Sequence, residues 1–303
     1  MTASFRCALA ALRRGDPLLA TASVVRRWLL VEEPGAWGRA GLTTSPIDPR
    51  VASTVAARAQ RHGVRVQLIR RPGRRHRRQE RRIALVSSAP GRERVWWRTI
   101  HADTELLDIP LEHAEDPPAD FTPSREPIYL VCTHGRKDVC CAIWGRPVVT
   151  NLAAHRPSNT WETTHVGGDR FAPNLVVLPH GLYYGQLSPE IALAAVKAYE
   201  EAQVLPGYLR GRTPYPPPAQ AAEHFARVEL RDSRLHGLQV AGVDQLDPVT
   251  WRIWLRHTGE AGTTMVETTV RAVSSPLPAQ LTCGNPQATH YRTFELVALQ
   301  VRH

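Results

Sequence analysis

The first 205 residues contain the same succession of apolar runs and helical segments twice, and this succession limits the folds that the chain can adopt. The first copy is expected to hold a strand, a helix and three further strands, at residues 24–33, 49–63, 64–71, 83–88 and 95–100. Pro49 is favourable at the start of a helix and Gly63 at its end. This order predicts an α/β unit of the thioredoxin-like type without a cysteine at its strand-to-helix turn.

The second copy begins with the buried strand 128–132, which ends at Cys132. Residues 133–146 are expected to form a loop, and Pro147 is expected to begin a short helix that ends at residue 155. The remaining elements of this copy are a strand, a glycine-containing loop, a hairpin turning at 180–181 and a helix, at residues 160–164, 165–174, 175–187 and 189–203. This is the thioredoxin order with its middle helix replaced by a loop.

The composition shifts divide the chain into three predicted regions. Residues 101–127 are acidic and contain prolines, and residues 207–218 are rich in proline and glycine, so both stretches suit boundaries. The expected fold class is α/β, with two thioredoxin-like units and a small C-terminal α+β domain. The expected domains are a thioredoxin-like half without a metal site, a thioredoxin-like unit with one, and a linker with the C-terminal domain, at residues 1–115, 116–205 and 206–303.

The charge of the chain is strongly positive, with a formal net charge of +10. Much of the excess lies at residues 70–82, RRPGRRHRRQERR, which we interpret as a solvated loop between two strands. No aromatic residue interleaves with these arginines to stack on bases, so nucleic acid is not expected as a partner. No apolar run approaches the roughly 20 residues that span a bilayer, and we expect a cytoplasmic protein without a membrane partner.

The five cysteines are an odd number, which is a poor disulfide framework, and three of them lie within ten residues. Cys132 and Cys141 are separated by eight residues, and His165 and Asp169 by three, each pair after a predicted strand. The spacing predicts a site of four ligands at one sheet edge, for which core packing gives no reason. Cys7 and Cys283, by contrast, are interpreted as small buried apolar residues, and Cys140 suits packing as well as ligation.

Two motifs carry a resemblance to a known family: CTHGRKDVCC at residues 132–141 and WETTHVGGDRFAPNLVVLPHGLYYGQL at residues 161–187. They resemble the sucrase/ferredoxin-like family, and the likeness extends over about residues 16–215. The resemblance implies a thioredoxin-like ferredoxin domain and a [2Fe-2S] cluster held by two cysteines and two histidines of an HxGGH motif. By position, the matching residues are Cys132, Cys141 and His165.

Asp169 stands where the family motif has its second histidine, because this chain reads HVGGD. With Asp169 as the fourth ligand, the site carries one more negative charge than a site of two thiolates and two imidazoles. It carries one negative charge fewer than a site of four thiolates. Because negative charge disfavours reduction, we expect a potential below the bis-histidine type and above the all-cysteine type. If Asp169 does not bind the metal, the alternative fourth ligands are Cys140, His134, His155 and His180.

These features predict an electron carrier rather than an enzyme, with a redox protein as donor or acceptor. The alternative is a structural or interaction module in which zinc is held by the same ligands, Cys132, Cys141, His165 and Asp169. A thiol-disulfide oxidoreductase acting through Cys140 and Cys141 is a weaker hypothesis, because adjacent cysteines form a strained bridge and the chain has no CxxC motif. Glycoside hydrolysis is rejected because the spacing singles out no facing pair of carboxylates.

Overall fold

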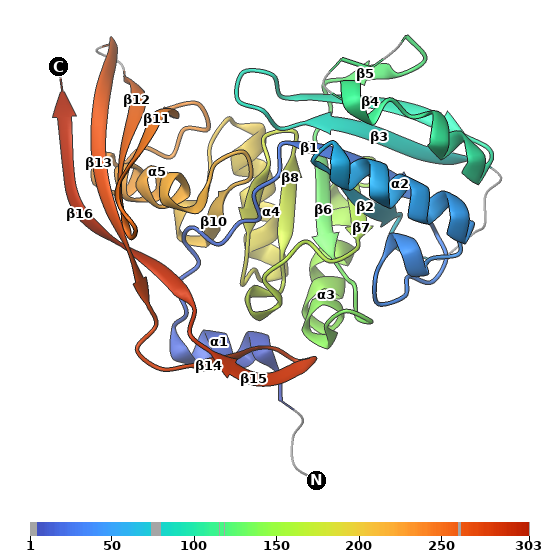
Figure 1. Cartoon of the computed structure of the whole chain (residues 1–303), viewed down its shortest axis with the longest axis horizontal. Coiled ribbons are helices and arrows are strands. Elements are labelled where there is room, and N and C mark those ends of the chain that lie inside the picture. The colour runs from blue at the N-terminus through green and yellow to red at the C-terminus, as the bar shows by residue number, and fades with distance from the viewer. Residues whose placement is uncertain (1–4, 74–79, 115, 118, 260–261, 303) are drawn as a thin grey trace.

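The computed structural model describes residues 5–302, apart from 74–79, 115, 118 and 260–261. Its main element is a mixed sheet of ten strands in the order β10-β9-β8-β6-β7-β2-β1-β3-β4-β5. A second sheet, β11-β12-β13-β16, lies at one end, and a short β14-β15 hairpin lies beside the N-terminal helix α1 (Figure 1). The predicted mixed α/β class is confirmed.

The first half of the large sheet contains one long helix and five strands. Its elements are β1 (Arg27–Glu32), α2 (Pro49–Arg61), β2 (Val64–Arg70), β3 (Arg81–Ser87), β4 (Arg94–Ile100) and β5 (Thr122–Ser124), with the short helices η1 (Leu42–Thr44), η2 (Asp103–Asp108) and η3 (Leu111–His113). The helix predicted from Pro49 and Gly63 is confirmed, because the Asp48 carboxylate caps its first N–H groups and Gly63 follows its end at a φ of +61°.

The second half repeats the order of the first. Its elements are β6 (Ile128–Cys132), α3 (Val139–His155), β7 (Thr160–Thr163), η4 (Asp169–Phe171), β8 (Leu175–Leu178), β9 (Leu182–Tyr184) and α4 (Pro189–Glu200). In each half the first two strands are parallel, and the third pairs antiparallel with the first. The halves join where β2 and β7 pair antiparallel, so strands on both sides of residue 115 share one sheet. The thioredoxin-like assignment and the division at this residue stay predictions.

The remainder of the chain supplies an edge strand of the main sheet, helix α1 and the C-terminal elements. Its elements are α1 (Cys7–Arg14), η5 (Pro206–Tyr208), β10 (Leu209–Arg212), α5 (Pro217–Leu230), β11 (Leu238–Asp247), β12 (Thr250–Gly259), β13 (Gly262–Ser274), β14 (Ala279–Thr282), β15 (Asn285–Thr289) and β16 (Arg292–Arg302). Helix α5 packs between β10 and the C-terminal sheet (Figure 1). Part of the predicted linker is therefore an edge strand of the main sheet.

The prediction that residues 133–146 form a loop is wrong for its last eight residues, and α3 does not begin at Pro147. The helix begins at Val139, because the Asp138 side chain accepts a hydrogen bond from the Cys140 N–H at 2.9 Å and caps it. Pro147 lies inside the helix. Because successive helical residues are about 100° apart around the axis, Cys140 and Cys141 point in different directions.

Alternate residues of the central strands face different layers of the core. Leu29 of β1 packs with α2, and Val131 of β6 packs with α3 and α4. Leu30 and Leu130 face the other side, in a cluster that also contains the first residues of α1 and the cysteines of α3. The segment around α1 therefore covers one face of both halves near the predicted metal site.

The arginine-rich stretch is partly paired with the sheet. Arg70 forms an ion pair with Glu162 at 2.6 Å, and Arg81 pairs with Glu33 at 3.3 Å. Residues 74–79, the middle of the predicted solvated loop, lie outside the described residues. Among the described helices, none is both long and apolar enough to cross a membrane.

His180, in the turn between β8 and β9, is expected to make stability depend on pH. Its Nδ1 lies 2.7 Å from the Tyr199 hydroxyl, and burial lowers its pKa to about 3. Below pH ~6.5 the unfolded chain binds a proton at His180 that the folded chain does not, so stability falls as the pH falls toward 3. We measure the free energy of unfolding in urea at pH 7 and at pH 5, for the native protein and for His180→Gln. We expect it to fall by about 1–2 kcal/mol more in the native protein than in the variant. Equal losses would contradict the assignment.

Candidate metal centre

The structure brings three of the four predicted ligands together. One ligand atom each of Cys132, Cys141 and His165 lies within 4.8 Å of the other two. Cys132 ends β6, His165 follows β7, and these strands are parallel, so their carboxyl ends meet at the same edge. Cys141 comes from the first turn of α3, which the sequence did not predict. The site thus combines two strand ends and one helix N-terminus.

Gly145 allows α3 to approach β6 closely. A Cβ atom at this position would lie 2.2 Å from the carbonyl oxygen of Cys132, a distance that real Cβ atoms do not reach. Because glycine has no side chain, the helix can sit directly on the strand end. The two thiols are thereby held together, and both are fully buried.

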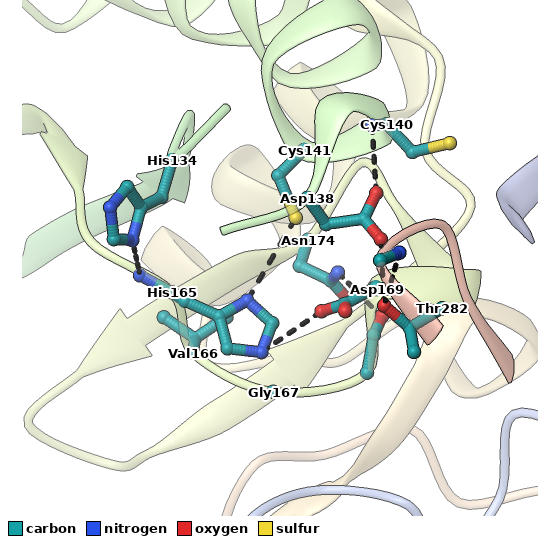
Figure 2. A network of polar contacts seen from close by, with 12 residues as sticks. His134, Asp138, Cys140, Cys141, His165, Val166, Gly167, Asp169, Asn174 and Thr282 are labelled. Atoms are coloured by element: carbon teal, nitrogen blue, oxygen red, sulfur yellow. Dashed lines mark hydrogen bonds and ion pairs between the residues drawn. The ribbon is translucent and has the colours of Figure 1, made fainter. Parts of the chain in front are cut away.

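His165 is held through both its ring and its backbone. Its Nδ1 lies 3.9 Å from the Cys141 sulfur, and its Nε2 lies 2.9 Å from Oδ1 of Asp169 (Figure 2). Its backbone N–H donates to Nδ1 of His134 at 3.2 Å. Its carbonyl accepts hydrogen bonds from Arg65 and Gln67 of β2, at 3.2 and 3.3 Å. The half of the sheet without a cysteine therefore helps to fix this predicted ligand.

The four side chains polarise one another. A hydrogen bond from Cys141 lowers the pKa of Cys132 well below its ordinary value, and that same bond, together with burial, raises the pKa of Cys141. Burial by itself lowers the pKa of His165, but Asp169 and Cys132 outweigh it and raise the pKa to about 9. Burial by itself raises the pKa of Asp169, but His165 outweighs it and the pKa is lowered. The raised pKa values of Cys141 and His165 favour their protonated forms, so a metal ion bound here would displace those protons.

Asp169 lies beside this set rather than within it. Its carboxylate is adjacent to the imidazole, but it is not among the three atoms that lie within 4.8 Å of one another. Its Oδ1 is buried and has no hydrogen bond of normal geometry, in spite of the short distance to His165. This oxygen faces the His165 ring, and its second lone pair can also bind a cation. Ligation by Asp169 stays a prediction.

The alternative fourth ligands have other partners in the structure. His134 uses both ring nitrogens, one toward the Gly38 carbonyl at 2.8 Å and one toward His165. His155 ends α3, far along the helix from Cys141, and bonds the carbonyl of Asn151. The alternatives His180 and Cys140 contact Tyr199 and Cys283 instead. Figure 2 shows Cys140 pointing away from the His165 ring.

Arg210 supports the loop that carries His165 and Asp169, and the sequence did not predict this role. It is buried, and its guanidinium donates to the Gly167 carbonyl at 2.9 Å and to the Asn174 side chain at 2.7 Å. A Cβ at Gly168 would lie 2.2 Å from its Nη2, so the glycine motif leaves room for this arginine. Burial lowers the pKa of Arg210 to about 10, and it remains cationic at neutral pH.

A second set of thiols lies on the other side of α3. The sulfurs of Cys7, Cys140 and Cys283 and the carboxylate of Asp138 lie within 4.8 Å of one another. Cys7 and Cys283 were expected to be isolated apolar residues. Only the folded chain shows that they meet, because they are 276 positions apart.

A mixed α/β chain with two cysteines and a histidine gathered at a sheet edge belongs to the class of proteins that can hold a metal ion there. The model of the family described as sucrase/ferredoxin-like matches residues 18–211, and the chain is a member of that family. The resemblance stated from the sequence motifs is confirmed.

One curated relative is similar over a short stretch. It is the Altered inheritance of mitochondria protein 32 of Meyerozyma guilliermondii, 35% identical over 75 residues, which are 21% of this chain and 26% of the relative. The match therefore spans about a quarter of that protein's length. No solved structure matches the chain.

Proposed function

We propose that the protein is a thioredoxin-like ferredoxin that carries single electrons through a [2Fe-2S] cluster. Cys132, Cys141 and His165 would be three of its ligands, and Asp169 would be the fourth. The observation that carries the proposal is the convergence of two thiols and one imidazole nitrogen within 4.8 Å at one sheet edge. Such a cluster, when bound, accepts and releases one electron.

The donor chemistry fits this group. Two thiolates with imidazole on one iron are an accepted ligand set, and Oδ1 of Asp169, beside the His165 ring, offers the remaining donor. The cationic Arg210 lies behind the same loop and offsets part of the negative charge of two thiolates and a carboxylate. The repeated strand order of the two halves agrees with the thioredoxin-like assignment.

His165 is the most exposed of the four proposed ligands. The sulfurs belong to residues with no exposed area, whereas the His165 side chain is 20% exposed. An electron therefore has its shortest route to solvent through this imidazole. We propose that a redox protein docks over His165 as donor or acceptor, in the cytoplasm.

The proposal is tested on protein purified without oxygen. We expect red-brown protein with two irons and two acid-labile sulfides per chain, and an EPR signal on reduction. The proposal would be overturned by a colourless native protein that contains zinc, together with loss of that zinc in Cys141→Ala. Those results would favour a zinc module with the same ligands.

Asp169→His is expected to raise the reduction potential, on the order of 100 mV, because a neutral imidazole replaces an anionic ligand. The measurement is a redox titration followed by visible absorption. Glu162→Gln is the matched control, since it removes a carboxylate of β7 whose partners are Arg70 and Thr133 rather than a proposed ligand. If Asp169→Ala keeps the native spectrum and potential, Asp169 is not a ligand.

A further inference from the structure

The second thiol set is assembled from three distant parts of the chain. Cys7 opens α1, Asp138 and Cys140 lie at the start of α3, and Cys283 lies between β14 and β15. The sulfurs of Cys140 and Cys283 are 3.5 Å apart, and the Cys7 sulfur lies 3.5 Å from Oδ2 of Asp138. Cys7, Asp138 and Cys140 are buried, and Cys283 is partly buried.

These distances suit one tetrahedral ion. Zinc binds thiolate sulfur at about 2.3 Å, so two sulfurs on one zinc are roughly 3.8 Å apart. The separation of 3.5 Å between Cys140 and Cys283 needs only a small adjustment. All four groups already lie within 4.8 Å of one another.

Backbone donors face the sulfurs, as they do around metal-bound thiolates. The Cys7 N–H donates to the Cys283 sulfur at 3.3 Å, and the backbone of Ala8 hydrogen-bonds Cys140. Helix α1 has no side-chain cap at Arg6, so its first N–H groups serve the thiols instead. Two helix N-termini, those of α1 and α3, thus converge on the set and favour negative charge there.

The Asp138 carboxylate is the fourth group of this set, and its hydrogen bonds leave room for one metal contact. Its Oδ2 accepts hydrogen bonds from the Thr282 hydroxyl at 3.0 Å and the Cys283 N–H at 2.8 Å. Its Oδ1 accepts one from the Cys140 N–H, and the Cys7 thiol lies 3.6 Å from that oxygen. Loss of the Cys7 proton leaves Oδ1 free to bind a cation.

We propose that Cys7, Cys140, Cys283 and Oδ1 of Asp138 form a second, structural zinc site. Binding releases the three thiol protons to solvent and changes no oxidation state. The ion ties α1 and the β14-β15 hairpin to the start of α3. Thr282, next to Cys283, is within hydrogen-bond reach of both Asp138 and Asp169, so the two sites lie close to each other.

The experiment separates this site from the proposed electron-transfer site. Native protein, purified with a reductant and without added metal, is expected to contain one zinc per chain by elemental analysis. Cys140→Ala and Cys283→Ser are expected to lower the zinc affinity at least about tenfold, in competition with a chelator, while iron content and the EPR signal persist. Cys141→Ala is expected to do the reverse, losing iron and keeping zinc.

A cobalt titration keeps the test decisive if a variant folds poorly. Metal-free Cys141→Ala, titrated with Co²⁺ under reductant, is expected to develop the intense charge-transfer and d–d bands of tetrahedral cobalt thiolate. The proposal is overturned if these bands do not develop, or if the native protein neither contains nor takes up zinc. It is equally overturned by a Cys140–Cys283 disulfide in the native protein, seen as a mass lower by two hydrogens.

Discussion

Cys141→Ala is expected to purify without iron and without visible absorption. The variant removes one of the two buried sulfurs of the proposed site, and a methyl group cannot bind iron in its place. Helix α3 should persist, because its cap, Asp138, is unchanged and alanine favours helix. Iron and sulfide content, visible absorption and the far-UV circular dichroism spectrum measure the three expectations.

Cys140→Ala is the matched control, because it removes the neighbouring thiol of the same helical turn. Its sulfur lies 3.5 Å from Cys283 and outside the Cys132, Cys141 and His165 set. We expect iron and the EPR signal to remain at the native level. Loss of iron in this control, or its retention in Cys141→Ala, would mean that the ligands have been assigned to the wrong cysteine.

Arg210→Met is expected to destabilise the fold by about 3–5 kcal/mol. The substitution leaves the Gly167 carbonyl, the Asn174 amide oxygen and the Thr21 carbonyl and hydroxyl without their donor. Each buried group left unpaired costs about 1–3 kcal/mol, and part of this is recovered by the apolar methionine chain. Urea unfolding monitored by tryptophan fluorescence gives the free energy of unfolding.

The loop between β7 and η4 is expected to loosen in the same variant, so the iron content should fall as well. Arg50→Met, an exposed arginine on α2, serves as the control, and we expect a change within about 0.5 kcal/mol. A change below about 1 kcal/mol in Arg210→Met would show that water replaces the guanidinium and that Arg210 is not the support of this loop.

The sequence was most informative where local chemistry decides the structure. Pro49 and Gly63 bounded α2, the apolar run of β6 ended at Cys132, and the turn at 180–181 joined β8 and β9 as predicted. Two of the predicted ligands follow from such local signals, because Cys132 is the last residue of β6 and His165 follows shortly after β7. Their proximity follows in turn from the parallel pairing of β6 and β7.

The start of α3 was missed because Pro147 is a stronger local signal than an aspartate cap. Asp138 was the available sign, but a proline nine positions into a helix is disfavoured by its missing N–H. The second thiol set and Arg210 could not be predicted at all. Cys7, Cys140 and Cys283 meet only in the folded chain. Their spacing along the sequence does not predict that they lie close together.

The pairing of β2 with β7, which joins the two halves of the sheet, limits how far this protein can be shortened. Arg65 and Gln67 of β2 hold the His165 carbonyl, and the Gln67 side chain also accepts hydrogen bonds from Thr163 and Thr164. A fragment of residues 116–205 would lose these partners and turn β7 into an open edge strand, a template for aggregation. The half without a predicted ligand therefore supports the predicted site, and we expect a shortened protein to keep that site only if it includes both halves.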